Sequence, residues 1–428
     1  MPALRLWWQF ARQSQGRGVD LLAVVAFTAA AACFYTVLGG VQAFLGRPDP
    51  SGTYQVAASI AGILVGVPIL TLGAAAARLS VTRRNARLAA IRLAGGTRGQ
   101  TTLIALLDTG AQAVVGALLG VLAYALLLPV MTLLPFQRTG FSVAEMWLGP
   151  ARIAALAAAM VLLALASAAI SLIAVSVSPL GVAQRASPRA MSVLRLVAAV
   201  VVLGLWSVVM QQPSVMLMLF FLAICIGIVN LVGPFVLWLV GKVAAGRAST
   251  AAKLVAARRL IDDPRAAWRM VSGVAFAIYI AGVLSVAPAM ASWSTDAETA
   301  QLFSDIGLGA WVTLGFTSVL AAVSAAVTQT CRLWDQAESY RGLRLAGTDV
   351  KVLRQIRVRE AALPVTAAVV IAGLASLVLV APIGLGMIVE TWSGLLSFLG
   401  VAIGAIILVL AAVAVTNPMV RRIVDVNP

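Results

Sequence analysis

The chain has 428 residues, of which 61% are hydrophobic and only 11% are charged, and its mean hydropathy is +1.01. Soluble domains carry about a quarter charged residues, so this composition excludes an ordinary soluble protein. A net charge of +16 is common in nucleic-acid-binding proteins, but here the basic residues are spread between long apolar runs, and we therefore expect no nucleic-acid partner.

Ten apolar runs are long enough to cross a hydrocarbon layer of ~30 Å as helices. A closed barrel would show short alternating segments instead, so we expect an all-α polytopic membrane protein. The fifth and sixth runs form a tight hairpin around Gln211, Gln212 and Pro213, or else a single broken helix. The expected spans are residues 21–43, 56–78, 102–130, 151–177, 193–210, 214–240, 269–291, 306–331, 361–381 and 393–416.

Residues 1–20 are expected to contact membrane lipid. This segment combines Arg5 and Arg12 with Trp7 and Trp8, which is typical of a helix lying at the membrane surface with its aromatic rings at headgroup level. The following apolar run has no convincing cleavage site, so we expect it to be a retained first span rather than a removed signal peptide.

Basic residues are distributed very unevenly between the two sides of the predicted topology. Of the 31 Lys and Arg residues, 28 fall on the side of both termini, and only Arg47, Arg138 and Arg152 fall on the other. The positive-inside rule makes the basic side, with both termini, cytoplasmic. The outer side carries the acidic residues Asp49, Glu145, Asp296, Glu298, Asp305 and Glu390.

A short motif occurs twice. The sequence Arg-Leu-Ala-Gly at 92–95 returns at 344–347, an offset of 252, and an acidic residue follows each glycine by 13 positions, as Asp108 and Glu360. Spans 1–4 also match spans 7–10 in order and spacing. We therefore predict two parallel four-helix repeats, joined by a two-helix connector that comprises spans 5 and 6. The expected units are residues 1–180 (repeat 1, with the basic segment 79–100), 181–250 (connector) and 251–428 (repeat 2, with the segment 332–360).

The first basic segment has the pattern of a short amphipathic helix. Arg83, Arg84 and Arg87 alternate with Leu88 and Ile91 at helical spacing, and two glycines follow. A basic loop that only sets topology and touches lipid headgroups is the alternative. Topology needs positive charge, however, and does not need the same apolar and glycine pattern twice.

These segments resemble a known family. Residues 83–109 and 338–361 are similar to the R-x-x-x-x-A-x-L-R-x-x-G-A-T-x-x-Q…E segment of FtsX-like permeases, the membrane subunits of ABC transporters of the MacB, LolC and BceB class. Ser178-Pro179-Leu180 resembles the tail after the fourth helix of such repeats. Ten spans with a connector pair resemble the BceB-like arrangement, but this chain lacks the large extracytoplasmic domain found in many members.

The resemblance implies a permease whose two basic segments act as coupling helices, each docked on one copy of a cytoplasmic ABC ATPase. The chain has no G-x-x-x-x-G-K-[ST] phosphate loop, so we expect no enzymatic activity of its own, with ATP and Mg bound by the partner. The family also implies a bacterial plasma membrane. The predicted ATPase-coupling residues are Arg83, Arg84, Arg87, Leu88, Ile91, Arg92, Gly95, Trp334, Arg341, Leu343, Arg344 and Gly347.

Few polar residues fall near or within the spans. Asp108, Asn230 and Glu360 are expected to be structural, through pairing with basic neighbours or a hydrogen bond between helices. Their scarcity argues against an ion-coupled secondary carrier, which needs buried ionisable groups. Three Cys without paired spacing and the absence of His argue against disulfides and against a metal site, and we expect no directly bound cofactor.

The leading functional prediction is an ATP-driven permease that moves or extracts an amphipathic substrate such as a lipid, a lipopeptide or an antimicrobial peptide, with antimicrobial peptide resistance as one outcome. The alternative is a mechanical signal transmitter that passes ATP-driven motion to a sensor kinase or a cell-wall hydrolase without transport.

Overall fold

The computed structural model of the chain describes residues 17–48, 52–82, 97–176, 215–284, 297–335 and 345–390, together with residue 342 and isolated positions within 197–208 and 396–411. This part of the chain is helical and contains no strand. The helices before residue 180 are α2 (Arg17–Gly46), α3 (Thr53–Thr82), α5 (Arg98–Thr132), the single turns η1 (Phe136–Arg138) and α6 (Val143–Met146), and α7 (Pro150–Ser176). Those after residue 210 are α9 (Val215–Gly246), α10 (Ala251–Asp262), α11 (Pro264–Leu284), α13 (Ala297–Asp335) and α15 (Val350–Glu390).

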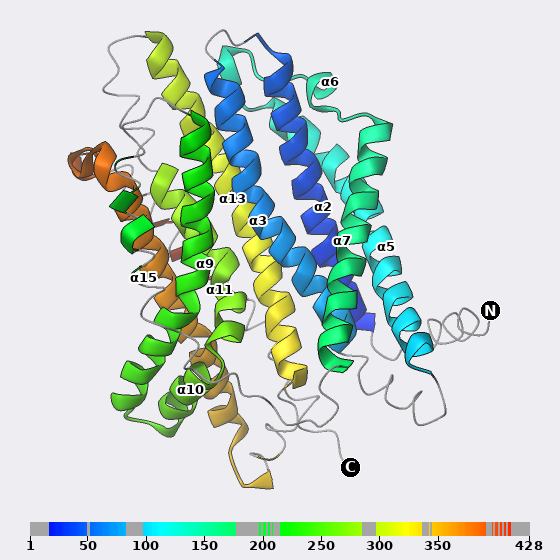
Figure 1. Cartoon of the computed structure of the whole chain (residues 1–428), viewed down its shortest axis with the longest axis vertical. Coiled ribbons are helices and arrows are strands. Elements are labelled where there is room, and N and C mark those ends of the chain that lie inside the picture. Colours follow the sequence, from blue (N-terminus) through cyan, green and yellow to red (C-terminus); the bar gives the residue numbers. More distant parts are fainter. Residues whose placement is uncertain are drawn as a thin grey trace.

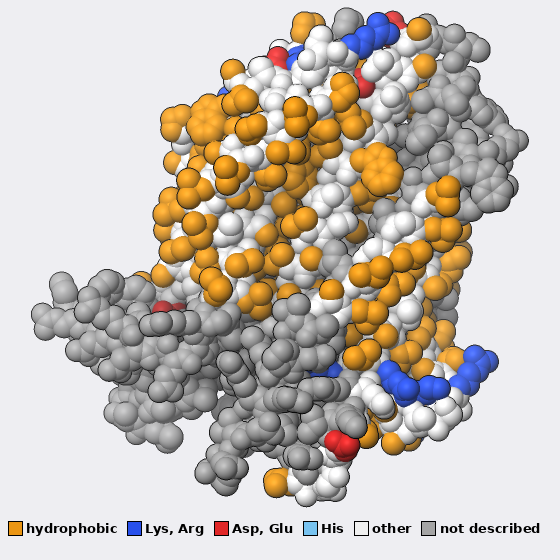
Figure 2. Space-filling model, turned by 180° about the vertical axis from the view of Figure 1, so that it is seen from behind, with side chains coloured by type: hydrophobic (Ala, Val, Ile, Leu, Met, Phe, Trp, Pro, Cys, Tyr) orange, Lys and Arg blue, Asp and Glu red, His pale blue; other side chains and the backbone are white. Residues whose placement is uncertain are grey.

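Seven of these helices, α2, α3, α5, α7, α9, α13 and α15, are long and apolar enough to cross a membrane. The long helices run along the long axis of the molecule, with α6 at one end and α10 at the other (Figure 1). Hydrophobic side chains cover the flank, whereas charged side chains gather towards the two ends (Figure 2). The predicted all-α, multi-pass membrane class is therefore confirmed. The predicted spans 193–210 and 393–416 fall where the structure describes only isolated positions.

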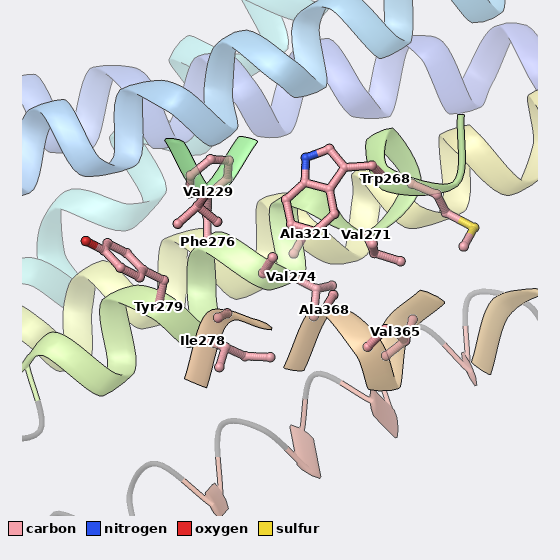
Figure 3. Packing of buried hydrophobic residues seen from close by; sticks show 14 of the residues in the cluster. Val229, Trp268, Val271, Val274, Phe276, Ile278, Tyr279, Ala321, Val365 and Ala368 are labelled. Carbon is pink, nitrogen blue, oxygen red and sulfur yellow. The ribbon is translucent and has the colours of Figure 1, made fainter. Parts of the chain in front are cut away.

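The seventh predicted span, 269–291, overlaps α11, which lies inside the protein. Every residue from 270 to 282 is buried, and the helix packs against α9, α13 and α15. Figure 3 shows Val274 and Ile278 of α11 beside Ala368 of α15, within one cluster of buried apolar residues. The two arginines of α11, Arg265 and Arg269, lie in its first two turns and are exposed, before the enclosed stretch begins.

Glycines allow α2 and α5 to pack closely. A Cβ added at Gly116 would lie 2.3 Å from Cβ of Phe27, and one added at Gly120 would lie 2.4 Å from Cβ of Ala31. Because the two glycines are four residues apart, they lie on one face of α5. This small-xxx-small spacing is the arrangement that brings membrane helices together. The packing of α2 on α5 therefore depends on the missing side chains at these two positions.

The helices on either side of the connector have matching neighbours. α2 packs mainly on α3 and α5, and α11 packs mainly on α13 and α15. Residues 108–114 of α5 and 360–366 of α15 match position by position in being buried, half-buried or exposed. Their offset of 252 is that of the repeated Arg-Leu-Ala-Gly motif. The two-repeat arrangement, with unit limits at residues 180 and 250, stays a prediction that these matches support.

The two groups of helices meet where α3 packs against α13. We call this contact the seam. Leu72 and Ala76 of α3 share one buried apolar cluster with Leu320 and Val327 of α13, and residues of α2 complete it. The described interior of the seam is therefore mainly apolar, and dispersion and close packing hold its two sides together.

The two longest helices extend well beyond the predicted spans. α13 covers Ala297–Asp335 around the predicted 306–331, and α15 covers Val350–Glu390 around the predicted 361–381. At about 1.5 Å per residue, α15 is roughly 60 Å long, about twice the hydrocarbon thickness. An apolar run marks the part of a helix that meets lipid, whereas backbone hydrogen bonds continue the helix into the polar regions on both sides.

Candidate functional site

Most residues predicted to contact an ATPase lie outside the described part of the chain. This holds for Arg83, Arg84, Arg87, Leu88, Ile91, Arg92 and Gly95 of the first segment, and for Arg341, Leu343 and Arg344 of the second. Trp334 belongs to the last turn of α13, and Gly347 lies just before α15. The structure therefore shows how the segments join the neighbouring helices.

The second segment, 332–360, includes a turn at residues 342–347 that leads directly into α15. The backbone N–H of Ala346 donates to the carbonyl of Gly342 at 2.9 Å, which closes one helical turn. Gly347 then adopts φ +88°, a left-handed conformation that a side chain would disfavour. Leu345 is 89% exposed. This part of the segment thus presents an apolar side chain outside the helical bundle, five residues before α15 begins.

The end of the first segment leads into α5 through a capping box. The backbone N–H of Gln100 donates to Oγ1 of Thr97 at 3.3 Å, and the backbone N–H of Thr97 donates to Oε1 of Gln100 at 3.0 Å. The two bonds satisfy donors that a helix start leaves unpaired and fix the position at which α5 begins. Both segments therefore run without a further loop into α5 and α15, the two helices in which residues 108–114 and 360–366 match in burial.

α10 is fastened to α15 by two side-chain contacts. Nη1 of Arg259 donates to Oε1 of Glu360 at 2.5 Å, and these side chains are only 21% and 10% exposed. Nη1 of Arg359 donates to Oγ1 of Thr250, the N-cap residue of α10, at 2.7 Å. Because the ion pair is largely shielded from water, its attraction is stronger than that of an exposed pair. Glu360 thus has a basic partner 101 residues earlier in the chain.

The other two polar residues predicted to be structural lie in helices. Asp108, at the position of α5 that corresponds to Glu360 in α15, is half-buried. Asn230 of α9 accepts a hydrogen bond through Oδ1 from Nε1 of Trp268 in α11, at 2.9 Å. This amide within the apolar layer is satisfied between two helices, which fits a structural role better than substrate contact.

The end of the molecule opposite α10 is closed by a network of polar side chains around Arg47, which we call the polar cap. The Arg47 guanidinium donates to the carboxylate of Glu145 at 2.9 Å, to Oε1 of Gln137 at 3.2 Å and to the carbonyl of Gly140. It also lies over the ring of Phe141, 4.4 Å from its centroid. Arg47 therefore binds the end of α2 to the connection between α5 and α7.

Asp305 of α13 ties the polar cap across the seam. Its side chain is buried, and Oδ2 accepts hydrogen bonds from the hydroxyl of Tyr54 at 2.8 Å and from the backbone N–H of Gln137 at 3.0 Å. Oδ1 accepts from Nε2 of Gln301 at 3.0 Å. Gln137 has φ +52°, an uncommon conformation for a residue with a side chain. One carboxylate thus holds the start of α3 and the α5–α7 connection against α13.

The electrostatics of the polar cap favour a charged Glu145. The hydrogen bond from Arg47 lowers the pKa of Glu145, and a hydrogen bond from the backbone N–H of Ser142 at 2.9 Å lowers it further. Among the described residues, no group of three or more His, Cys, Asp or Glu is placed to hold a metal ion. The polar cap thus combines the Arg47–Glu145 ion pair with a second carboxylate, Asp305, which accepts from neutral donors.

Sequence reasoning missed the polar cap as a unit. Arg47, Glu145 and Asp305 were identified only as charges of the outer side, because the partners in these contacts are 98 and 251 residues apart in the chain. The available signal was the scarcity of such charges: the outer side has only three basic residues, so each of them was a candidate for a specific partner.

No family model matches the chain, and comparisons with curated proteins and with solved structures also found no match. Of the two ends of the molecule, the α10 end is the one at which α5 and α15, the helices that follow the glycines of the repeated motif, begin (Figure 1). The polar cap at the other end carries the hydrogen bonds that cross the seam.

Proposed function

We propose that the chain is the membrane permease subunit of an ABC transporter in a bacterial plasma membrane. ATP and Mg are bound by two copies of a separate cytoplasmic ATPase, one for each of the segments 79–100 and 332–360. The observation that carries this proposal is that both segments join directly to helices, α5 and α15, whose burial matches at the offset of the repeated motif. A segment that only sets topology needs basic residues, but no matching helix after it.

In this proposal the α10 end faces the cytoplasm and the polar cap faces outward, in agreement with the positive-inside rule. ATP binding draws the two ATPase copies together, and the coupling segments move with them. Because α5 packs on α2 and α15 packs on α11, movement of the segments displaces both groups of helices and changes their contact along the seam.

An amphipathic substrate fits this arrangement best. The seam is mainly apolar, and the polar cap closes its outer end through Asp305. A lipid, a lipopeptide or an antimicrobial peptide already dissolved in the bilayer reaches the helices from the side and does not have to pass the polar cap. Removal of such peptides from the membrane would give the cell resistance to them.

The test is to co-express the chain with the ABC ATPase encoded beside it and to purify the complex from detergent. Subunit ratio and ATP hydrolysis are then measured for the original chain and for a coupling variant. We expect one permease with two ATPase copies for the original chain and no complex for the variant. The variant carries Arg83→Gln, Arg84→Gln, Arg344→Gln, Ile91→Ser and Leu345→Ser.

A matched control removes the same number of positive charges from the same side of the protein. It carries Lys242→Gln, Arg247→Gln and Lys253→Gln, all at exposed positions of α9, α10 and the turn between them. We expect this control to assemble as the original chain does. If no ATPase associates, or if the coupling variant assembles and hydrolyses ATP normally, the repeated segments only set topology and the proposal is wrong. Co-purification of a sensor kinase, with ATP hydrolysis that no amphipathic compound changes, would favour the signal transmitter.

A further inference from the structure

The first turns of α15 form the end of the second coupling segment. α15 begins at Val350, and the part that is apolar enough to cross the membrane begins at Gln355. Glu360 lies in the third turn, followed by Ala361, which is fully buried in the cluster around α11. Because no loop interrupts this helix, a displacement at its start is carried along the helix axis to Glu360.

α10 lies against the helices that surround this part of α15. Its buried side packs on α9 and α15, and it leads through Asp263 directly into α11. The contact with α9 is tight, since a Cβ added at Gly241 would lie 3.0 Å from Cγ1 of Ile261 and 3.3 Å from the carbonyl oxygen of Ala257. A displacement of α10 therefore moves the end of α9, which belongs to the predicted connector.

The basic residues of α10 differ in their surroundings. Arg259 is bonded to a carboxylate of another helix, whereas Lys253 donates to Oγ of Ser249 nearby and Arg258 is exposed to solvent. The shielded pair of Arg259 and Glu360 is a charged contact between α10 and α15. Loss of either partner removes this attraction and leaves the other charge largely shielded from water, so the preference of the two helices for one relative position at this point is weakened.

We infer that Arg259 and Glu360 are positioning residues that transmit the movement of α15 to α10, and through α10 to α9. The inference rests on the proposed function, because an ATPase docked on the second segment supplies the movement. Arg359 and Thr250 hold the other end of α10. Without the ion pair, the second segment still binds the ATPase, but its movement no longer displaces the connector.

The experiment compares three changes at the pair with a matched control on the same helix. The changes are Arg259→Gln, Glu360→Gln and the reversed pair Arg259→Glu with Glu360→Arg, and the control is Arg258→Gln. Each chain is purified with the ATPase in lipid nanodiscs, and the subunit ratio and ATP hydrolysis are measured. Separately, the chain alone carries spin labels on cysteines introduced at Leu254 and Leu345, both exposed positions, and the distance between the labels is measured.

We expect each single variant to assemble at the original ratio and to hydrolyse ATP about fivefold or more slowly, the lower end of typical coupling between sites. The reversed pair should restore the rate of ATP hydrolysis to within about twofold of the original chain, since it re-forms the ion pair with the two charges exchanged between the helices. Arg258→Gln should behave as the original chain. Full hydrolysis in both single variants would overturn the inference, and so would a reversed pair that folds and assembles but stays as slow as the single variants.

The label distances separate a failure of the inference from a failure of the proposed function. If the original chain captures no ATPase, the proposed function is wrong. The label distances in the chain alone then decide whether Arg259 and Glu360 link α10 to α15. A distance distribution that broadens in both single variants and narrows again in the reversed pair supports the link. A distribution that is the same in all four chains overturns it.

Discussion

Gly233 lies on α9 where the indole ring of Trp268 crosses it. A Cβ at this position would lie 2.3 Å from Cδ2 and Cε2 of the ring, whereas carbon atoms pack at about 3.5–4.0 Å. The change Gly233→Ala therefore requires the ring to move by more than ~1 Å. Trp268 is only 3% exposed and is enclosed by the cluster around α11 (Figure 3), so the ring has little space to move into.

Three contributions set the size of the expected effect. Overpacking of a closed core costs about 1–3 kcal/mol. Movement of the ring also strains the hydrogen bond from Trp268 to Asn230, and such bonds between membrane helices are worth ~0.6 kcal/mol on average. Alanine recovers up to ~1 kcal/mol relative to glycine through its helix propensity. The net expectation is that Gly233→Ala lowers the free energy of unfolding by roughly 0.5–2.5 kcal/mol.

Gly227 provides the control on the same helix. It is exposed, and a Cβ added there has no atom within 4 Å, so Gly227→Ala should be neutral or slightly stabilising. Both variants are heated in detergent, and the folded fraction that remains is measured by size-exclusion chromatography. A midpoint for Gly233→Ala equal to or above that of Gly227→Ala would refute the packing argument.

Two further predictions concern the polar cap. Asp305→Ala leaves the hydroxyl of Tyr54 and the backbone N–H of Gln137 without their acceptor, so it should lower stability by about 2–4 kcal/mol, measured by thermal unfolding. Glu145→Gln should lower the unfolding midpoint at neutral pH and have progressively less effect in acid. The pKa of Glu145 is lowered in the folded protein, so its pairing with Arg47 stabilises the fold above the ordinary carboxyl pKa and is lost as pH falls through the folded value.

Each of these predictions has a contrasting outcome. Asp305→Asn keeps an oxygen acceptor at the same place, so it should lose much less stability than Asp305→Ala; equal losses would contradict the assigned hydrogen bonds. For Glu145, a difference between the original chain and the Gln variant that persists undiminished at roughly pH 3 would mean that the stabilisation does not come from the carboxylate charge.

Apolar runs in the sequence predicted those parts of the helices that meet lipid. The predicted spans 21–43 and 102–130 lie within α2 and α5, because both helices are apolar along most of their length. The same reasoning could not predict either end of α13 or the start of α15, since those outer turns are polar and are held by backbone hydrogen bonds. α10 lies between the predicted spans 214–240 and 269–291, where apolar runs give no signal, and its buried contact with α9 depends on a glycine of another helix.

Contacts between distant residues were beyond the reach of the sequence. Asn230 was expected to have a partner on another helix, but the identity of Trp268 follows from the close approach at Gly233. Likewise, Glu360 was expected to pair with a basic neighbour, and several arginines were available nearby in sequence. The choice of Arg259 depends on how α10 turns back along α15, which neither periodicity nor composition reveals.

The enclosure of α11 has a consequence for biosynthesis. Its buried faces are covered by α13 and α15, which leave the ribosome later. During synthesis the buried faces of α11 therefore lack these two neighbours until the chain beyond residue 350 has been made. A chain interrupted before residue 350 would leave in the bilayer a helix that the complete protein keeps away from lipid, and it should be a preferred substrate for membrane quality control.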